Sequence, residues 1–404
     1  VDAAHHDAVT AWTYSVGGQS LTGHGVQIAV LDSGMDMETG STGRPHKAFY
    51  ANGDPLDHSG GGIDGSRVLT SVNYGGFWTP QPPEDFHGHG TRVASTIAAA
   101  KWSNGLDVAD SVAHSAHLHN FKISDDSQPG AAASTWDMSE ALNAALADPA
   151  IRVANLSYDG DPHPSYHLNH DIDAASNAGV LVVLSAGNNG SDLTFAHGAY
   201  NSLAVGGSYE LAPFPYFTSA IGPLDPTGTM ARRYPDLIAN GVDISTARLD
   251  VEHLYTLATG TSLSAGFVSG AAGLLFQADP SLSPVEAKAL LLQHTWDISS
   301  GNPLAGGLGY LRVKEAVDGA LAGDVRSGTL DPDGSVEFRV ALTAGTPVRY
   351  TLAWERTGEV VPDDLDLFVL DPSGAVVASS ATDHDVEERV SFTPAVSGTY
   401  RVQV

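Results

Sequence analysis

A serine stands among small residues in GTSLSAGF, residues 260–267, just ahead of the apolar run 268–276. Ser262 could be a nucleophile, because a positioned base can take the proton of a serine hydroxyl during attack. It could equally be the N-cap of the helix that the apolar run predicts, with its hydroxyl holding a free N–H of the first turn. Taken alone, the octapeptide favours the cap.

A histidine in DFHGHGTRVAS, residues 85–95, offers a base for such a nucleophile. His89 stands at an expected helix start that runs into residues 93–100, and histidine titrates near neutral pH. The alternatives are a helix cap, a surface group or, together with His87, a metal ligand. The metal alternative lacks a carboxylate or a third histidine at ligand spacing.

Short apolar runs that end in polar turns indicate the frame that would hold these residues. One run, in residues 25–34, ends at Asp32, and another, in residues 179–190, ends in a turn that contains Asn188. Further strand and helix candidates alternate along the chain, at residues 117–124, 139–147, 151–157 and 172–177. This alternation predicts an α/β fold with a doubly wound, mostly parallel sheet. In such sheets ligands bind outside the carboxyl ends of the strands, where Asp32 and Asn188 fall.

The pattern of elements changes near residue 324. Before that point, a capping box at Ser283 and Glu286 with a proline between them predicts a helix ending at Gln293. After it, strand patterns at 336–340 and 365–369 are separated by Pro, Gly and Asp turns, with no helix signal. The sequence therefore predicts an α/β domain at residues 1–323, which carries the candidate nucleophile and base, and a small all-β, jelly-roll-like sandwich at residues 324–404.

Composition narrows the classes of partner. The 404 residues include no cysteine, and 47 acidic against 19 basic residues give a net charge of −28. This charge argues against nucleic acid and against an anionic membrane, because both need a basic surface. No apolar run approaches the roughly 18 residues of a membrane span, and the absence of cysteine excludes disulfides and thiolate chemistry.

The segments VLDSG, HGHGTRVAS, AGNNG and GTSLSAGFVSGAAGLL follow one another in the order Asp, His, Asn, Ser, and with them the chain resembles the subtilisin family of serine proteases. The order Asp, His, Ser is typical of that family, whereas α/β-hydrolases carry Ser, Asp, His and a G-x-S-x-G turn that Ser262 lacks. The resemblance covers residues 11–321, including SVAHSAHLHNFKIS, NLSYDG, SLAVGGS and GLGYLRVKEAV.

The resemblance implies a role for each of the four polar residues. Ser262 would be the nucleophile, His89 its general base, and Asp32 the group that orients the imidazole and stabilises its charged form. Asn188 matches the family's oxyanion residue, whose side-chain N–H and the backbone N–H of Ser262 would bind the developing oxyanion. Alone, Asn188 would be interpreted as a turn asparagine.

The resemblance also implies two substrate-binding segments. NLSYDG matches the edge segment that pairs with a peptide substrate, and LSAG matches the opposite wall of the first specificity pocket. The residues implied are Ser157, Tyr158, Asp159, Gly160, Ser185, Ala186 and Gly187. Tyr158 and Asp159 stand where the family commonly has leucine and glycine. We expect a preference for a large apolar side chain, and the alternative is a basic one recruited by Asp159.

Three departures from the family pattern lie near the catalytic motifs. Arg92 replaces a histidine after HGT, Leu263 replaces the methionine after the nucleophile, and Gly266-Phe267 replaces a proline-histidine pair. Loss of the proline makes the helix entry less rigid. A catalytically inactive subtilase used as a binding scaffold and a tripeptidyl-peptidase-type exopeptidase are the alternatives to an endopeptidase.

Family members commonly hold calcium, so the resemblance implies a structural calcium ion. The segment PDDLDLFVLDPSG resembles a strand of the β-sandwich domains attached to secreted bacterial subtilases, and its acids surround a turn. The expected ligands are Asp363, Asp364, Asp366 and Asp371. Oxygen-rich segments at 54–64 and 104–110 are other candidates, and a solvated acidic loop is the alternative.

Together these observations predict a secreted serine endopeptidase that acts on protein or peptide substrates. The family is made with an N-terminal pro-domain, which is therefore an expected partner during maturation, and we expect a monomer. The acidic, glycine-rich stretch at residues 40–85 is expected to be an insertion-like loop.

Overall fold

The protein is described from a computed structural model. The described residues are 7–37, 43–76, 81–100, 102–103, 108–109, 111–128, 130–209, 212–225, 231–249, 255–298, 304–331, 334–357 and 362–404.

Ten strands of the described residues pair into one central sheet. They are β3 (Gln27–Asp32), β4 (Val68–Asn73), β7 (His117–Lys122), β8 (Ile151–Leu156), β9 (Leu181–Ser185), β10 (Leu203–Tyr209), β11 (Ala212–Pro215), β12 (Leu237–Asn240), β15 (Thr295–Trp296) and β16 (Tyr310–Leu311). The strand order is β15-β16-β12-β10-β9-β8-β3-β7-β4, with β11 beside β10. Only the β10–β11 and β15–β16 pairs of these strands are antiparallel, which confirms the predicted mostly parallel sheet.

Strand β3 shows why the sheet is covered on both faces. Ile28 and Val30 point into one hydrophobic core, whereas Ala29 and Leu31 point into a second core on the other face. Side chains alternate between the two faces of a strand, so a strand that is apolar at every position must be buried on both. Asp32 ends this run between β7 and β8, where the chain order reverses.

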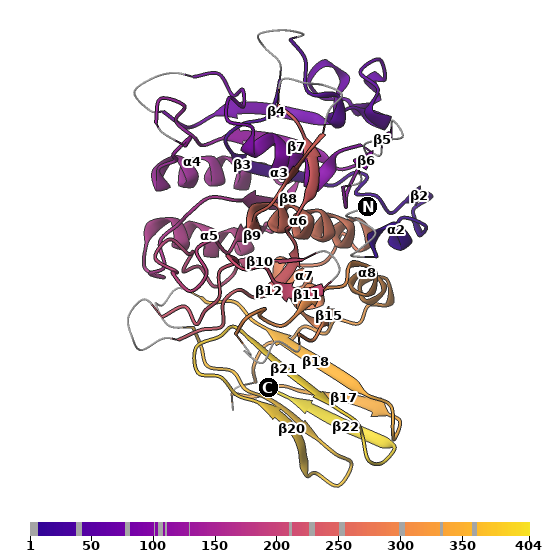
Figure 1. Ribbon diagram of the computed structural model, residues 1–404. Coiled ribbons are helices and arrows are strands. Elements are labelled where there is room, and N and C mark those ends of the chain that lie inside the picture. Colours follow the sequence, from indigo (N-terminus) through magenta and orange to yellow (C-terminus); the bar gives the residue numbers. More distant parts are fainter. Residues whose placement is uncertain are drawn as a thin grey trace.

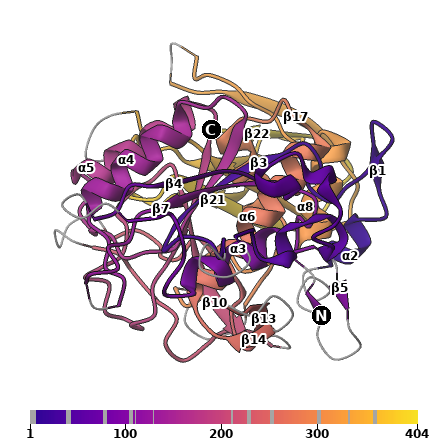
Figure 2. The same ribbon diagram turned by 90° about the horizontal axis from the view of Figure 1, so that it is seen from above.

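Helices form the two outer layers of this domain. On one face α3 (His89–Ala98) and α6 (Thr261–Ala278) pack against the sheet, with α8 (Val313–Ala322) against α6. On the other face lie α4 (Thr135–Leu146) and α5 (His167–Asn177), and Figure 2 shows this second pair together at one side of the molecule. The predicted doubly wound fold is therefore confirmed.

The remaining elements of this part are short. They are α2 (Ala8–Ala11), β1 (Ser15–Val16), β2 (Gln19–Ser20), the 3-10 turns η1 (Lys47–Phe49), η2 (Ala51–Gly53), η3 (His58–Gly60) and η4 (Ile63–Gly65), β5 (Trp102–Ser103), β6 (Val108–Ala109), β13 (Ile244–Ala247) and β14 (Tyr255–Ala258).

The expectation of a loop throughout residues 40–85 is wrong in one part. Strand β4 closes the sheet by pairing with β7, and its burial alternates because it is an edge strand with one face partly exposed. Its residues VLTSVN contain few large apolar side chains, so the sequence gives a weaker strand signal there than at β3.

Helix α7 (Pro284–Gln293) begins and ends where the sequence predicts. The hydroxyl of Ser283 accepts the backbone N–H of Glu286, and the carboxylate of Glu286 accepts the backbone N–H of Ser283. Each group satisfies a donor that the first helical turn leaves free. The predicted capping box is therefore confirmed.

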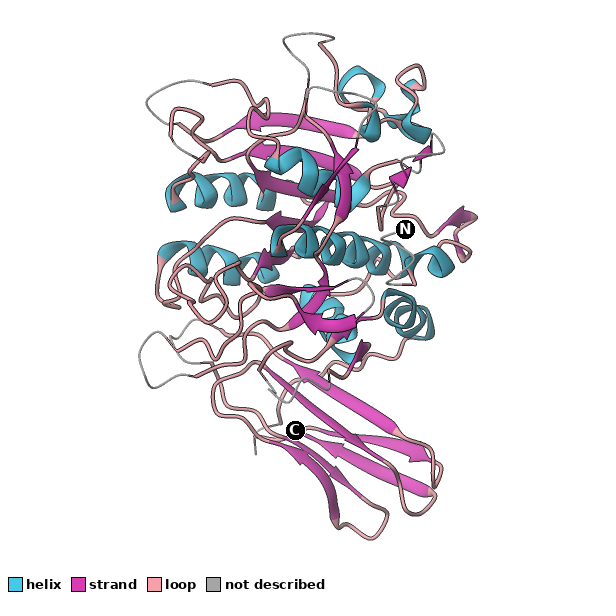
Figure 3. Cartoon of the chain, viewed as in Figure 1, coloured by secondary structure: helices cyan, strands magenta, loops and turns pink. Residues whose placement is uncertain are grey.

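The last part of the chain consists of strands and loops (Figure 3). A four-stranded sheet has the order β17-β22-β19-β20, and β18 pairs with β21; the strands are β17 (Glu337–Leu342), β18 (Val348–Ala353), β19 (Leu367–Leu370), β20 (Val376–Ser380), β21 (Glu387–Phe392) and β22 (Gly398–Gln403). Apolar side chains of both sheets, including Val369 and Val390, share one core. The predicted small β domain is confirmed, although β19 begins two residues after the predicted start at 365.

This β domain lies against the α/β domain (Figure 1), and buried ion pairs join the two. Glu387 of β21 lies 3.5 Å from Lys288 of α7, and both side chains are at most 3% exposed. Arg356, after β18, pairs with Asp173 of α5. Around these pairs Trp354 packs against Tyr200. The two domains are thus joined by paired charges inside an apolar contact, which is typical of a fixed interface rather than a loose tether.

No helix among the described residues is both long and apolar enough to cross a bilayer.

Replacement of Glu387 by glutamine should destabilise the whole protein. It removes the buried charge that lies 3.5 Å from Lys288 and 3.8 Å from Arg233, and breaking one partner of a buried pair costs about 3 kcal/mol or more. The matched control is Glu337→Gln in the same β domain. Its partners are the exposed Arg339 and the partly exposed Arg401, so this change should cost less than about 1 kcal/mol. Urea unfolding of both variants measures the difference; equal losses would contradict a fixed interface.

Candidate active site

Asp32 is held at the carboxyl end of β3 with its side chain 1% exposed. Its Oδ1 accepts the backbone N–H of Ser33 at 2.7 Å and lies 2.6 Å from Nδ1 of His89. A buried carboxylate is stable in the charged form only when donors and positive charge surround it. The two contacts provide such donors and fix the direction in which the carboxylate points.

His89 is the first residue of α3 and follows Gly88, which has a left-handed φ of 87°. The next residue, Gly90, lets the helix approach β3 closely, since a Cβ there would lie 2.1 Å from the carbonyl oxygen of Gly34 and 3.1 Å from Asp32. A larger residue at 90 would push the imidazole away from the carboxylate. The glycine after the histidine is therefore a steric requirement of the Asp32–His89 contact.

Several groups act on the pKa of His89. Burial lowers it, but the charge and hydrogen bond of Asp32 raise it, Asp85 adds to the rise, and Arg92 opposes it. The net pKa lies above the usual 6.5. Because Nδ1 faces Asp32, Nε2 is the ring nitrogen left to accept a proton.

Ser262 is the second residue of α6, and the N-cap position belongs to Gly260. The N-cap alternative for Ser262 is therefore wrong. Its side chain is 6% exposed, and its carbonyl accepts the hydroxyl of Ser157 at 3.2 Å. The hydroxyl of Ser262 is not needed to hold the helix, which leaves it available for chemistry.

Asn188 lies beside the start of α6. Its Oδ1 accepts the backbone N–H of Thr261 at 3.0 Å and the phenol of Tyr216. Burial raises the pKa of Tyr216 to about 12, so the phenol stays a donor. With its oxygen engaged on both sides, the amide of Asn188 keeps its NH₂ group free to donate to another molecule.

His89 and Ser262 lie at the starts of two packed helices, α3 and α6. The ring of Tyr158 meets the ring of His89 edge-on, with 5.8 Å between the ring centres. The residue before it, Ser157, donates its hydroxyl to the carbonyl of Ser262. Two consecutive residues after β8 therefore contact His89 and Ser262. Within the described chain the hydroxyl of Ser262 makes no hydrogen bond to His89. Such contacts are often long before substrate binds.

The close packing of the two helices explains one departure from the family pattern. A Cβ at Gly266 would lie 1.9 Å from Oγ1 of Thr96 in α3. Gly266 therefore brings α6 against α3, and with it the end that carries Ser262. Leu263, another departure, is 3% exposed beside that serine.

Comparison with known proteins shows the family of the chain. Residues 23–322 match the profile of the Subtilase family, and residues 337–404 match the Bacterial pre-peptidase C-terminal domain. The chain belongs to the subtilase family. It is 30% identical to Subtilisin BL of Lederbergia lenta over 294 residues, which are 72% of this chain and 90% of that protein. Fervidolysin of Fervidobacterium pennivorans is 28% identical over 348 residues, 80% of this chain and 44% of that protein.

The predicted substrate-binding residues of this subtilase follow two neighbouring parallel strands. Ser157, Tyr158, Asp159 and Gly160 leave the end of β8, and Ser185 ends β9 and leads into Ala186 and Gly187. Gly187 donates its N–H to the hydroxyl of Thr261 at 3.2 Å. Desolvation raises the pKa of Asp159. The structure thus brings both segments to the edge of the sheet where Asp32, Asn188 and Ser262 lie.

One residue that sequence reasoning missed holds the first of these segments. His197 is 1% exposed, and its Nε2 bonds the carbonyl of Tyr158 at 2.9 Å. Burial lowers the pKa of His197 to about 4, so the ring is neutral and Nε2 donates. A Cβ at Gly160 would meet this ring at 2.2 Å. No motif marks His197, because its partner is 39 residues away in the sequence.

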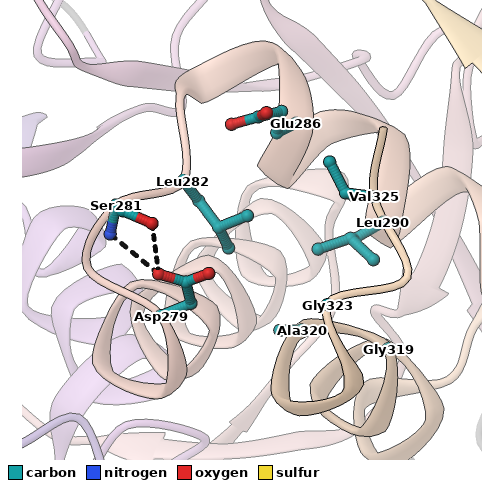
Figure 4. A pocket seen from close by; sticks show the side chains of 9 residues that line it. All are labelled: Asp279, Ser281, Leu282, Glu286, Leu290, Gly319, Ala320, Gly323 and Val325. Atoms are coloured by element: carbon teal, nitrogen blue, oxygen red, sulfur yellow. Dashed lines mark hydrogen bonds between the residues drawn. The ribbon is translucent and has the colours of Figure 1, made fainter. Parts of the chain in front are cut away.

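A pocket of about 180 Å³ lies at the opposite end of α6, between that end, α7 and α8 (Figure 4). Its lining residues are Asp279, Ser281, Leu282, Glu286, Leu290, Gly319, Ala320, Gly323 and Val325. Ser262 is 17 residues away along the helix, or about 25 Å. The pocket is therefore separate from the residues of the candidate active site.

The four aspartates of the β domain do not gather around one point in the described part of the chain. No three His, Cys, Asp or Glu side chains of the described residues gather around one point. Asp371 instead closes its own turn, because its Oδ1 accepts the N–H groups of Ser373 and Ala375. Asp363 and Asp364 are exposed. The expected ligand set Asp363, Asp364, Asp366 and Asp371 is not supported by this geometry, and calcium binding by the chain stays a prediction.

Removal of calcium should therefore change the melting temperature of the wild type and of a variant without Asp364 and Asp366 by the same amount. We expect the same change in melting temperature on adding a chelator to the wild type and to Asp364→Ala/Asp366→Ala, because these side chains do not share a ligand position. Differential scanning calorimetry with calcium and with chelator makes the comparison. A chelator that lowers only the wild-type melting temperature would restore the site in the β domain.

Proposed function

We propose that this subtilase is a secreted serine endopeptidase that hydrolyses peptide bonds with Asp32, His89 and Ser262. The observation that carries the proposal is the 2.6 Å contact between the buried Asp32 and Nδ1 of His89, at the start of a helix packed on the one that begins with Ser262. This pair fixes the imidazole so that Nε2 can accept the proton of the serine hydroxyl.

The reaction then proceeds in two halves. Ser262 Oγ attacks the peptide carbonyl while His89 takes its proton, and His89 returns that proton to the leaving amine. Water then repeats the sequence on the acyl-enzyme, and the acid product leaves. The raised pKa of His89 favours the charged imidazolium that forms in each half, because Asp32 stabilises it.

The negative oxygen of each tetrahedral intermediate would be bound by Asn188. Tyr216 and Thr261 hold the amide oxygen, which orients the NH₂ group before substrate arrives. The backbone N–H groups at the start of α6 add a partial positive charge. Donors arranged in advance are worth more than mobile ones, since they need no reorganisation during the reaction.

A peptide would bind as an extended strand along residues 157–160, with residues 185–187 opposite. The side chain preferred beside the scissile bond is either large and apolar or, through the charge of Asp159, basic. Secretion, removal of an N-terminal pro-domain and a monomeric state stay predictions of the same proposal.

Digestion of a mixed protein sample tests the activity. We expect the wild type to cut at internal positions, and Ser262→Ala to lose turnover by about a millionfold with little change in melting temperature, because the hydroxyl caps no helix. Peptide mass spectrometry identifies the cut sites. Successive tripeptides from the N-terminus would instead mean an exopeptidase, and no cleavage by folded wild type would mean an inactive binding scaffold.

Asn188→Ala should lower kcat by about 10²–10³ and leave KM nearly unchanged, the size typical of losing one oxyanion donor. The matched control is Asn189→Ala, an exposed asparagine in the same turn, which should behave as wild type. Steady-state kinetics on a peptide amide measures both. If Asn188→Ala changed KM alone, Asn188 would bind the substrate and not the oxyanion.

A further inference from the structure

Asp85 is a buried carboxylate for which the proposed mechanism has no role. Its side chain is 1% exposed, and its two oxygens accept five hydrogen bonds. Oδ1 accepts the N–H groups of His87 and Gly88 and the hydroxyl of Ser33, and Oδ2 accepts the N–H and the hydroxyl of Thr91. Every one of these donors belongs to the turn before α3, to its first residues, or to the residue after Asp32.

These bonds join the two pieces of chain that carry Asp32 and His89. The hydroxyl of Ser33 donates to Asp85 at 2.9 Å and accepts the N–H of Gly90 at 2.8 Å. The N–H of Ser33 in turn donates to Asp32 at 2.7 Å. Ser33 therefore bridges Asp85, the carboxylate of Asp32 and the residue after His89.

We propose that Asp85 is a positioning residue that holds β3 and the start of α3 together, so that the Asp32–His89 contact forms at catalytic distance. This inference rests on the proposed function. Fixing reacting groups within a fraction of an ångström controls rate, and a displacement of 1 Å costs about a hundredfold. A helix cap alone would need one or two of the five bonds, whereas the bond to Ser33 reaches across to β3.

Asp85 also acts on the imidazole through its charge. The charged and titratable groups around His89 are Asp32 from β3, Asp85 from the turn, Arg92 from α3, Tyr158 after β8 and His87. Asp85 raises the pKa of His89 and Arg92 lowers it. His89 must be neutral to act as base, so activity rises with pH through its pKa. Loss of the Asp85 charge should move that rise to lower pH, and loss of the Arg92 charge to higher pH.

Two variants separate the effect of Asp85 on the position of His89 from the effect of its charge on the pKa of His89. Asp85→Asn removes the charge and places an NH₂ group against N–H and O–H donors, so both parts are lost. Ser33→Ala keeps the charge and removes only the bridge. Asp279→Asn is the matched control, because Asp279 also closes a turn by accepting the N–H and hydroxyl of Ser281, at the far end of α6.

The measurement is kcat and KM for peptide amide hydrolysis across pH, with Arg92→Gln to calibrate the direction of the shift. The midpoint of a pH profile does not depend on how much of a preparation is folded. We expect Asp85→Asn to lower kcat by about 10- to 100-fold at unchanged KM and to move the acidic limb to lower pH. Ser33→Ala should lower kcat with the limb near its wild-type position, and Asp279→Asn should match wild type.

The proposal is overturned if the acidic limb of Asp85→Asn keeps the wild-type midpoint while that of Arg92→Gln shifts. It is also overturned if Asp85→Asn keeps the wild-type kcat. If Asp85→Asn yields no folded protein, Ser33→Ala tests the positioning role instead. A wild-type kcat in Ser33→Ala, which lacks the hydroxyl bridge, overturns that role. An inactive wild type would refute the proposed function itself, whereas an active wild type with unaffected variants refutes only the role of Asp85.

Discussion

A charged carboxylate in a protein interior needs hydrogen-bond donors, and at the centre of the sheet Oδ1 of Asp32 receives two, from the backbone of Ser33 and from Nδ1 of His89. Several separate parts of the chain provide the surroundings of Asp32. The strand end provides the N–H of Ser33, α3 provides His89, and Gly90 lets that helix come close enough. The position of β3 between β7 and β8 places the pair where the order of strands reverses, which leaves room above the sheet edge for a substrate.

The same problem of buried charge recurs where the two domains meet. Lys288 and Asp173 of the α/β domain are nearly inaccessible and find their partners, Glu387 and Arg356, in the β domain. Asp173 also accepts the backbone N–H groups of Tyr200 and Asn201, just beyond His197, which holds Tyr158. The β domain thus contacts the chain segment that supports a substrate-binding strand, although its own core is separate.

The charge of −28 gives these buried pairs a further significance. Most acids among the described residues are at least partly exposed, and their mutual repulsion opposes a compact state. Some of the few basic residues neutralise acids inside the protein, as Arg356 and Lys288 do. A small number of cations therefore has a structural effect larger than their number in the composition would indicate.

The sequence alone determined the α/β fold, the later β domain, the capping box of α7 and the family, because apolar runs, turn residues and the order of motifs are local properties. It also indicated Asp32, His89, Asn188 and Ser262 as the residues to examine. Only the tertiary structure decided that Ser262 is not an N-cap, that β4 closes the sheet, and that the four aspartates of the β domain do not gather around one point. It alone revealed Asp85 and His197, because their partners come from other elements, and a contact between distant segments leaves no periodic or spacing signal in the chain.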